Sequence, residues 1–166
     1  MQDNFITTRL TLEALQPGDD HFIYELVNSP GWIAFIGNRN INGIGDAAAY
    51  IQRILHNPDI RYWVVSLKEG KVPVGIITFI KRETLEHPDL GFAFLPGHEG
   101  KGYAYEAAKT VLDTLVAAKT YNRILATTIP DNIRSIHLLE KLGFGFDHEM
   151  KDEKEILRVY GFECIS

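Results

Sequence analysis

The residues with the clearest chemical meaning lie in a glycine-rich turn, where Gly100 and Gly102 follow a short apolar run and precede a helical pattern. Glycine has no side chain and tolerates left-handed backbone angles, so a ligand can approach the main chain closely there. The start of the following helix offers unpaired N–H groups and a partial positive charge. The turn therefore predicts a phosphate cradle, although an ordinary strand-to-helix turn would need the same glycines.

The strands and helices that position this turn follow from the spacing of the apolar residues. Alternating or continuous apolar runs predict strands over 6–15, 62–68, 74–80, 90–95, 123–129, 144–150 and 156–164. Helical spacing predicts helices over 17–27, 46–57, 104–116 and 132–142. Pro30 and Gly31 are expected to end the first helix, and 32–43 to form an irregular loop.

This order of elements indicates the fold class. Paired strands followed by alternating strands and helices predict an α/β or α+β fold. We expect a central mixed sheet of about seven strands with about four helices on its faces. A chain of 166 residues, 45% of them hydrophobic, can bury one sizeable core, and no linker-like stretch divides it. We therefore expect a single domain over 1–166.

Composition excludes several classes of function. The formal net charge is −5, and no block of lysine and arginine is long enough to follow a phosphate backbone, which argues against direct nucleic-acid binding. Cys164 is the only cysteine and the six histidines lack metal-ligand spacing, so we predict no metal site. No signal peptide or membrane span is apparent, which favours a cytoplasmic protein without membrane contact.

Two segments together carry a resemblance to the GNAT N-acetyltransferases. The turn is similar to motif A of that family, Arg/Gln-x-x-Gly-x-Gly/Ala, with Glu99, Gly102 and Ala104 at the marked places. Its context, Leu95-Pro-x-x-x-Gly-Lys-Gly-Tyr-Ala-x-Glu-Ala107, resembles the branch that contains the ribosomal-protein alanine N-acetyltransferases. The segment Asn132-x-x-Ser135 through Glu140-Lys-Leu-Gly-Phe144 is similar to motif B of that branch. The first strands also match, so the resemblance covers nearly the whole chain.

The resemblance implies a mostly antiparallel sheet, splayed in the middle between the strands at Leu90 and Arg123, with acetyl-CoA in the cleft. Backbone groups near Phe94 and Leu95 would pair with its pantetheine arm, and the N–H groups of 100–104 would hold its pyrophosphate. Glu99 departs from the motif, and its carboxylate is expected to point to solvent. The residues expected to bind acetyl-CoA are Phe94, Leu95, Gly100, Lys101, Gly102, Tyr103, Ala104 and Asn132.

The resemblance also implies an acid that protonates the departing thiolate, and here the chain departs from the family. Many members carry a tyrosine seven residues after the motif B asparagine, where this chain has Leu139. Ser135 lies one helical turn after Asn132, so both side chains face the same side of the helix. We predict Ser135 as the acid, directly or through water. The alternative is that its hydroxyl bonds back to the helix.

Removal of a proton from the acceptor amine requires a base. Asp89, at the start of the central strand, and Glu149, in a late strand, are the carboxylate candidates. The weaker candidates are His87, His137 and His148. A backbone N–H near Leu95 is expected to stabilise the oxyanion.

The acceptor itself is left open by the sequence. Trp32 and Phe35 are candidates for an acceptor pocket, although aromatic residues at such spacing are more often core. A peptide N-terminus and a small amine both fit, and the acidic surface mildly favours a cationic acceptor. The apolar late strands are compatible with a homodimer. The alternative function is an acyl-CoA sensor that keeps the cradle but transfers nothing, as Leu139 and Glu99 would suggest.

Overall fold

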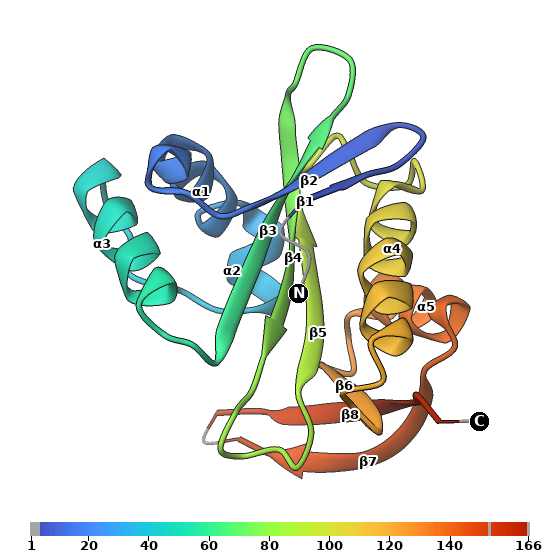
Figure 1. Ribbon diagram of the computed structural model, residues 1–166. Coiled ribbons are helices and arrows are strands. Elements are labelled where there is room, and N and C mark those ends of the chain that lie inside the picture. The colour runs from blue at the N-terminus through green and yellow to red at the C-terminus, as the bar shows by residue number, and fades with distance from the viewer. Residues whose placement is uncertain (1–3, 153, 166) are drawn as a thin grey trace.

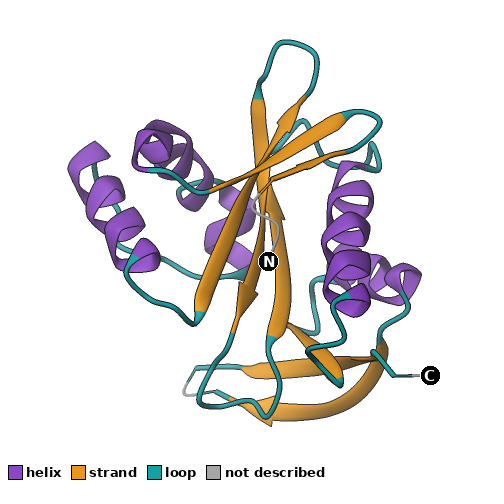
Figure 2. Ribbon diagram, in the orientation of Figure 1, coloured by secondary structure: helices purple, strands orange, loops and turns teal. Residues whose placement is uncertain are grey.

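A central sheet of eight strands forms the middle layer of the protein (Figure 2). The computed structural model describes residues 4–152 and 154–165. The order across the sheet is β1-β2-β3-β4-β5-β6-β8-β7, and every neighbouring pair is antiparallel except β5 with β6. The strands are β1 (Asn4–Ile6), β2 (Leu10–Ala14), β3 (Ile60–Leu67), β4 (Pro73–Ile80), β5 (Asp89–Phe94), β6 (Arg123–Thr128), β7 (Gly145–Lys151) and β8 (Ile156–Glu163).

Helices cover both faces of this sheet (Figure 1). Three of them lie on one face, and α4 and α5 lie on the other. In the described residues the helices are α1 (Asp20–Val27), α2 (Pro30–Phe35), α3 (Ile44–Leu55), α4 (Tyr103–Ala117) and α5 (Ile133–Leu142), with a short 3-10 turn over Pro17–Asp19. The expected α/β fold with a mostly antiparallel sheet is confirmed, with eight strands and five α-helices instead of about seven and four.

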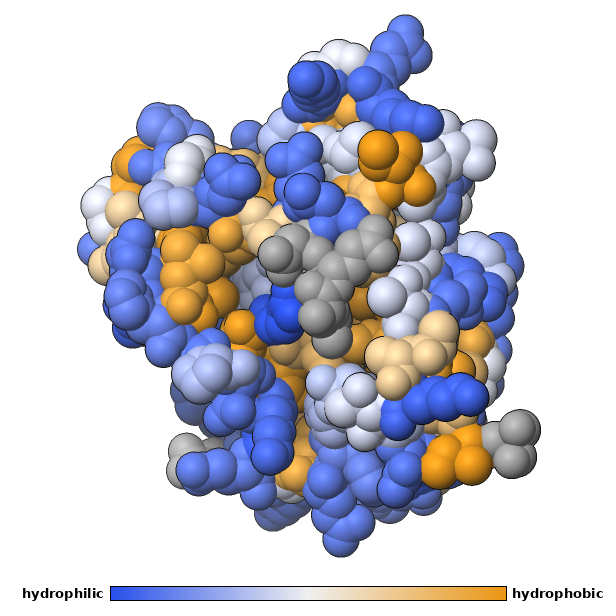
Figure 3. Space-filling model, viewed as in Figure 1, coloured by the Kyte–Doolittle hydropathy of each residue, from blue (hydrophilic) through white to orange (hydrophobic). Residues whose placement is uncertain are grey.

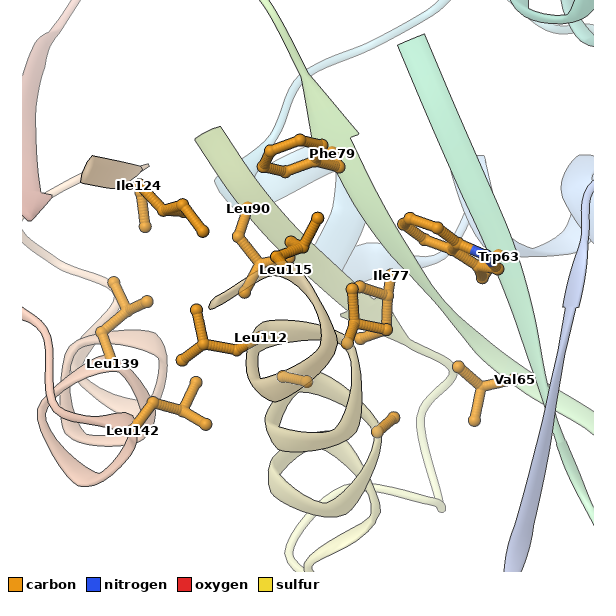
Figure 4. Packing of buried hydrophobic residues seen from close by; sticks show 14 of the residues in the cluster. Trp63, Val65, Ile77, Phe79, Leu90, Leu112, Leu115, Ile124, Leu139 and Leu142 are labelled. Carbon is orange, nitrogen blue, oxygen red and sulfur yellow. The ribbon is translucent and has the colours of Figure 1, made fainter. Parts of the chain in front are cut away.

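The sheet separates two hydrophobic clusters because successive side chains of a strand point to opposite faces. On the α4 and α5 face, Leu112 and Leu115 of α4 pack toward Leu90 and Ile124 of the central strands (Figure 4). The other cluster joins α1, α2 and α3 to the opposite side of β3 and β4. Figure 3 shows that the surface seen in this orientation is largely hydrophilic, with apolar residues in separate patches.

Two local predictions near the N-terminus were wrong. The expected strand over 6–15 is a hairpin, because the chain turns at 7–9 and the Leu10 N–H donates to the Thr7 hydroxyl at 3.0 Å. Pro30 does not end a helix but begins α2, where its missing N–H costs no helical hydrogen bond. By contrast, the helix expected over 132–142 is present as α5, and Gly143 ends it in the left-handed conformation, with φ of 103°.

The sheet opens between β5 and β6, as the family resemblance implied. Asp89 opposite Leu125 is the one residue pair in register between these strands, and the Leu125 N–H donates to the Pro88 carbonyl at 2.9 Å. Beyond this point the two strands diverge, so the edge of β5 that faces β6 has no strand beside it. No helix in the described part of the chain is long and apolar enough to cross a membrane.

Candidate active site

A cleft of about 1180 Å³ passes through the opening between β5 and β6. Its wall includes α2 and the edge of β4 on one face of the sheet. It continues past β5 to the glycine-rich turn and the N-terminal end of α5 on the other. A ligand in this cleft would therefore contact both faces of the sheet at the point where its backbone is unpaired.

The glycine-rich turn has the geometry of an anion cradle. Gly100 and Gly102 have φ of 75° and 82°, in the left-handed region that favours glycine, and both line the cleft. Gly102 is also the N-cap of α4, whose first N–H groups have no partner within the helix. The buried Nδ1 of His98, in the same wall, has no hydrogen-bond partner among the described residues. The backbone N–H groups of the turn and of the first turn of α4 fit the phosphates of a nucleotide-containing thioester.

Arg9 holds this turn from the β1–β2 hairpin, which reaches toward the N-terminal end of α4 (Figure 1). Its guanidinium donates to the Lys101 carbonyl at 2.9 Å and pairs with Glu106 at 2.8 Å. It also lies over the Tyr103 ring, 4.5 Å from the centroid. Burial alone would raise the pKa of Glu106, but hydrogen bonds from Thr7 and Arg9 hold it below its ordinary value. The Glu106 carboxylate is therefore ionised at neutral pH and keeps its ion pair with Arg9.

We expect Arg9→Gln to raise the KM for acetyl-CoA about threefold to tenfold and to leave kcat nearly unchanged. The substitution removes an ion pair and a hydrogen bond that shape the turn, each of which contributes about 1 kcal/mol in a partly exposed setting. Steady-state kinetics with varied acetyl-CoA measure the effect. The matched control is Lys109→Gln, which removes an ion pair with Asp113 on the outer side of α4. Equal effects of the two substitutions would contradict the role of Arg9 in holding the glycine-rich turn.

The backbone of β5 offers free groups at the opening, at one of the two residues expected. The Leu95 N–H donates to the Val74 carbonyl at 2.8 Å, and its side chain is buried away from the cleft wall. It cannot also serve an oxyanion, so that prediction is corrected. Antiparallel pairing alternates the direction of backbone groups, and the N–H and C=O of Phe94 consequently point toward β6. Phe94 lines the cleft and has no strand partner on that side.

Asn132 and Ser135 lie at the other wall, at the start of α5. The Asn132 side chain caps the helix by accepting from the Ser135 N–H at 3.2 Å. The Ser135 hydroxyl lines the cleft and makes no hydrogen bond to another described residue, so it is available to a ligand. Leu139, in the place of the family's tyrosine, is 1% exposed and belongs to the core. No side chain at that place can donate a proton.

Asp89 is the buried carboxylate of the site. It is 5% exposed and lines the cleft at the point where β5 and β6 separate. Burial raises the pKa of its carboxyl, and the neighbouring Arg82 partly opposes this rise. The Arg82 Nε lies 3.2 Å from both carboxylate oxygens. Such a carboxylate is held in a fixed orientation and binds a proton more tightly than an exposed one.

Some of the remaining residues predicted from the sequence line the cleft, and others lie outside it. Trp32 and Phe35 both line the cleft, on the face opposite the cradle. Glu149 is exposed on β7 and is not part of the cleft wall, so it does not join Asp89. Lys101 also lies outside the wall and contributes its carbonyl to Arg9 instead. The Glu99 carboxylate is 41% exposed and pairs with Arg134 of α5 at 2.7 Å, so a neighbour offsets its charge.

Sequence reasoning missed several polar residues of the cleft, among them Arg82, Arg39 and Tyr62. Arg82 lies in the loop after β4, Arg39 lies between α2 and α3, and the Tyr62 hydroxyl is 3.0 Å from that of Tyr50. None of them belongs to a local motif. Tyr62 could have been found from its place in an apolar strand, where a hydroxyl requires a partner.

The opening between β5 and β6, with a backbone cradle beside it, is the arrangement that the resemblance implied for an acetyl-CoA-dependent acyltransferase. Residues 9–145 match the family model described as "Acetyltransferase (GNAT) domain". The chain belongs to this family and is a GNAT-type N-acetyltransferase.

Individual relatives agree with this assignment. The chain is 27% identical to the uncharacterized N-acetyltransferase YnaD of Bacillus subtilis (strain 168) over 82% of this chain and 79% of that one. The ribosomal-protein-S5-alanine acetyltransferase from Vibrio fischeri has the same fold, with a TM-score of 0.81 and 20% identity over 98% and 97% of the two chains. The spermidine N-acetyltransferase from Vibrio cholerae, solved in complex with CoA and spermine, has a TM-score of 0.79 and 20% identity over 95% and 96%.

Proposed function

We propose that this protein transfers the acetyl group of acetyl-CoA directly to a primary amine, without a covalent enzyme intermediate. The observation that carries the proposal is the position of Asp89. It lies buried in a cleft whose far end is the cradle formed by Gly100 and Gly102. A base and a phosphate site on opposite faces of one opening suit a reaction in which two substrates meet in the middle.

Each step can be assigned to a group in the cleft. The turn around Gly102 and the start of α4 would hold the pyrophosphate, and the free backbone of Phe94 would pair with the pantetheine arm. Asp89 takes a proton from the acceptor ammonium, directly or through water, and the neutral nitrogen attacks the thioester carbonyl. The Phe94 N–H donates to the oxyanion. The attacking nitrogen then loses its second proton to water and the carbon–sulfur bond breaks, while Ser135 protonates the thiolate and recovers its proton from that water.

We propose a small amine or a peptide N-terminus as the acceptor. The cleft is open enough for either, and the spermine bound to the related Vibrio cholerae enzyme supports a small amine. Trp32 and Phe35 would contact its carbon chain.

Two measurements on one sample test the proposal. Thermal unfolding with acetyl-CoA and with CoA should show stabilisation that grows with ligand concentration, because the ligands bind only the folded state. Release of free thiol should then be followed over a panel of primary amines. Turnover of any amine supports an enzyme, whereas binding without turnover favours an acyl-CoA sensor. No shift at millimolar ligand would overturn both functions.

The role of Ser135 has its own prediction. We expect Ser135→Ala to lower kcat about tenfold to a hundredfold with little change in the KM for acetyl-CoA, because a positioned acid accelerates departure of the thiolate. Asn132→Ala is the matched control, since it removes the cap that positions Ser135 but leaves the hydroxyl. A Ser135→Ala variant with full activity would show that water supplies this proton.

A further inference from the structure

The half of the cleft on the α2 side contains a hydrogen-bond donor that the proposed chemistry does not use. Trp32 of α2 is 5% exposed and lines the cleft. Its Nε1–H is buried and has no acceptor among residues 4–152 and 154–165. A buried N–H without an acceptor is unfavourable, and most buried N–H groups in native proteins have a partner in the protein or in ordered water. Indole nitrogen donates only, so the missing partner is an acceptor.

A positive charge lies beside this donor. The Cζ of Arg39 is 5.9 Å from the centroid of the Trp32 ring, and Arg39 also lines the cleft. No carboxylate of the described residues forms an ion pair with it. A guanidinium stays charged at every physiological pH and presents donors in a plane that matches a carboxylate or phosphate. Arg39 calls for an anion, and an oxygen of that anion is also an acceptor for the Trp32 N–H.

The position of this pair relative to the base follows from Tyr62. Burial raises the pKa of the Tyr62 hydroxyl, while the positive charges of Arg39 and Arg82 oppose the rise. Both arginines consequently lie within electrostatic range of one hydroxyl. Arg82 is bonded to Asp89, so this wall runs from Arg39 past Tyr62 to Arg82 and Asp89. Trp32, Arg39 and Asp89 all line the same cleft.

We propose that Arg39 and Trp32 bind an anionic group of the acceptor, which is a small primary amine that also carries a carboxylate or a phosphoryl group. The inference rests on the proposed function, because it places the amine at Asp89. The net charge of the chain predicted a cationic acceptor, but Arg39 is a positive charge at the cleft itself and acts on a ligand there at shorter range than the overall charge does. Two exposed carboxylates of the β7–β8 turn, Asp152 and Glu155, also line the cleft and would favour a cation. The test therefore includes a diamine.

The test compares amines of one length that differ only at the far end: n-pentylamine, δ-aminovalerate and cadaverine. A shorter set uses n-propylamine and β-alanine, and ethanolamine against phosphoethanolamine separates a carboxylate site from a phosphate site. We expect the anionic member of at least one set to have a kcat/KM about tenfold or more above that of its neutral analogue, as a charge-assisted hydrogen bond provides. Binding of the same compounds to the enzyme with CoA is measured by calorimetry.

Two substitutions assign the preference to the site. Arg39→Gln should abolish the advantage of the anionic amine through KM, and Trp32→Phe should reduce it while keeping the ring. Arg53→Gln is the matched control, because Arg53 lies over Tyr50 at the same 5.9 Å but outside the cleft wall. It should retain the preference. Circular dichroism confirms that each variant is folded.

The outcomes separate this inference from the proposed function. If the kcat/KM for the neutral amines or for cadaverine equals or exceeds that for the anionic amines, the anion site is overturned, whereas the proposed acetyltransferase function is not affected. An anionic preference that survives Arg39→Gln also overturns the anion site. Binding of anionic amines that depends on Arg39, with no turnover, supports the anion site and counts against transfer.

Discussion

Replacement of Asp89 by asparagine is expected to lower kcat about a hundredfold or more while the KM for acetyl-CoA stays the same, as loss of a positioned base does. Asparagine has nearly the same shape and can still accept from Arg82, but it cannot take a proton from the acceptor. The substitution also removes a buried charge, so the variant is expected to fold. Initial rates with saturating acetyl-CoA measure the loss.

The pH dependence of activity is a second test of Asp89 as the base. Because burial raises the pKa of Asp89, we expect the activity of the native protein to fall on the acid side with a midpoint above the ordinary value for aspartate. Activity is present above this pKa, where the carboxylate is ionised, and is lost as the pH drops through it. The same pH profile is measured for the Asp89→Asn variant. The ammonium group of the acceptor titrates with both the native protein and the variant, so the difference between their two pH profiles reports on Asp89 alone.

The stability of the protein should respond in the opposite sense. The folded state binds the Asp89 proton more tightly than the unfolded chain does, so this group favours folding at low pH and the contribution is lost as the pH rises through the folded pKa.

For the activity measurements, Glu149→Gln is the matched control, because Glu149 is an exposed carboxylate outside the cleft wall. Full activity of Asp89→Asn would assign the base to water or to another group.

The parts of the site that sequence predicted are those built by neighbouring residues. Gly100 and Gly102 mark left-handed positions before a helix, and Asn132 marks a helix start, so each can be read from a few consecutive letters. The helix ended by Gly143 was predictable for the same reason. Such signals depend on local backbone conformation and hardly at all on what the rest of the chain does.

The parts that were missed depend on contacts between distant segments. Arg9 and Glu106 meet only because the β1–β2 hairpin lies over the start of α4. Phe94 and Leu95 were both expected to have free backbone groups, and only the register of β4 with β5, which a sequence pattern does not fix, leaves Phe94 free and Leu95 paired. Pro30 was misread because proline is compatible with the end of one helix and with the first residue of the next. In each case the outcome depends on tertiary contacts that a local sequence pattern does not contain.

Replacement of Gly102 by alanine is expected to weaken acetyl-CoA binding about tenfold or more. Gly102 has φ of 82°, and a Cβ there would lie 3.2 Å from the Arg9 guanidinium. A residue with a side chain at this angle costs about 1–2 kcal/mol of backbone strain, which the loop relieves by moving away from the left-handed conformation. Any such movement turns the first N–H groups of α4 away from the phosphates. Calorimetric titration with CoA measures the loss.

A second glycine separates strain from the loss of the cradle. Gly97 has φ of 89°, a Cβ there would meet nothing within 4 Å, and the residue is not part of the cleft wall. Gly97→Ala should therefore cost a similar amount of stability but leave the affinity for CoA within about twofold of the native value. If the two variants lose affinity equally, the turn acts through general loop stability. If Gly102→Ala binds CoA normally, the pyrophosphate lies elsewhere in the cleft and the assignment of the cradle fails.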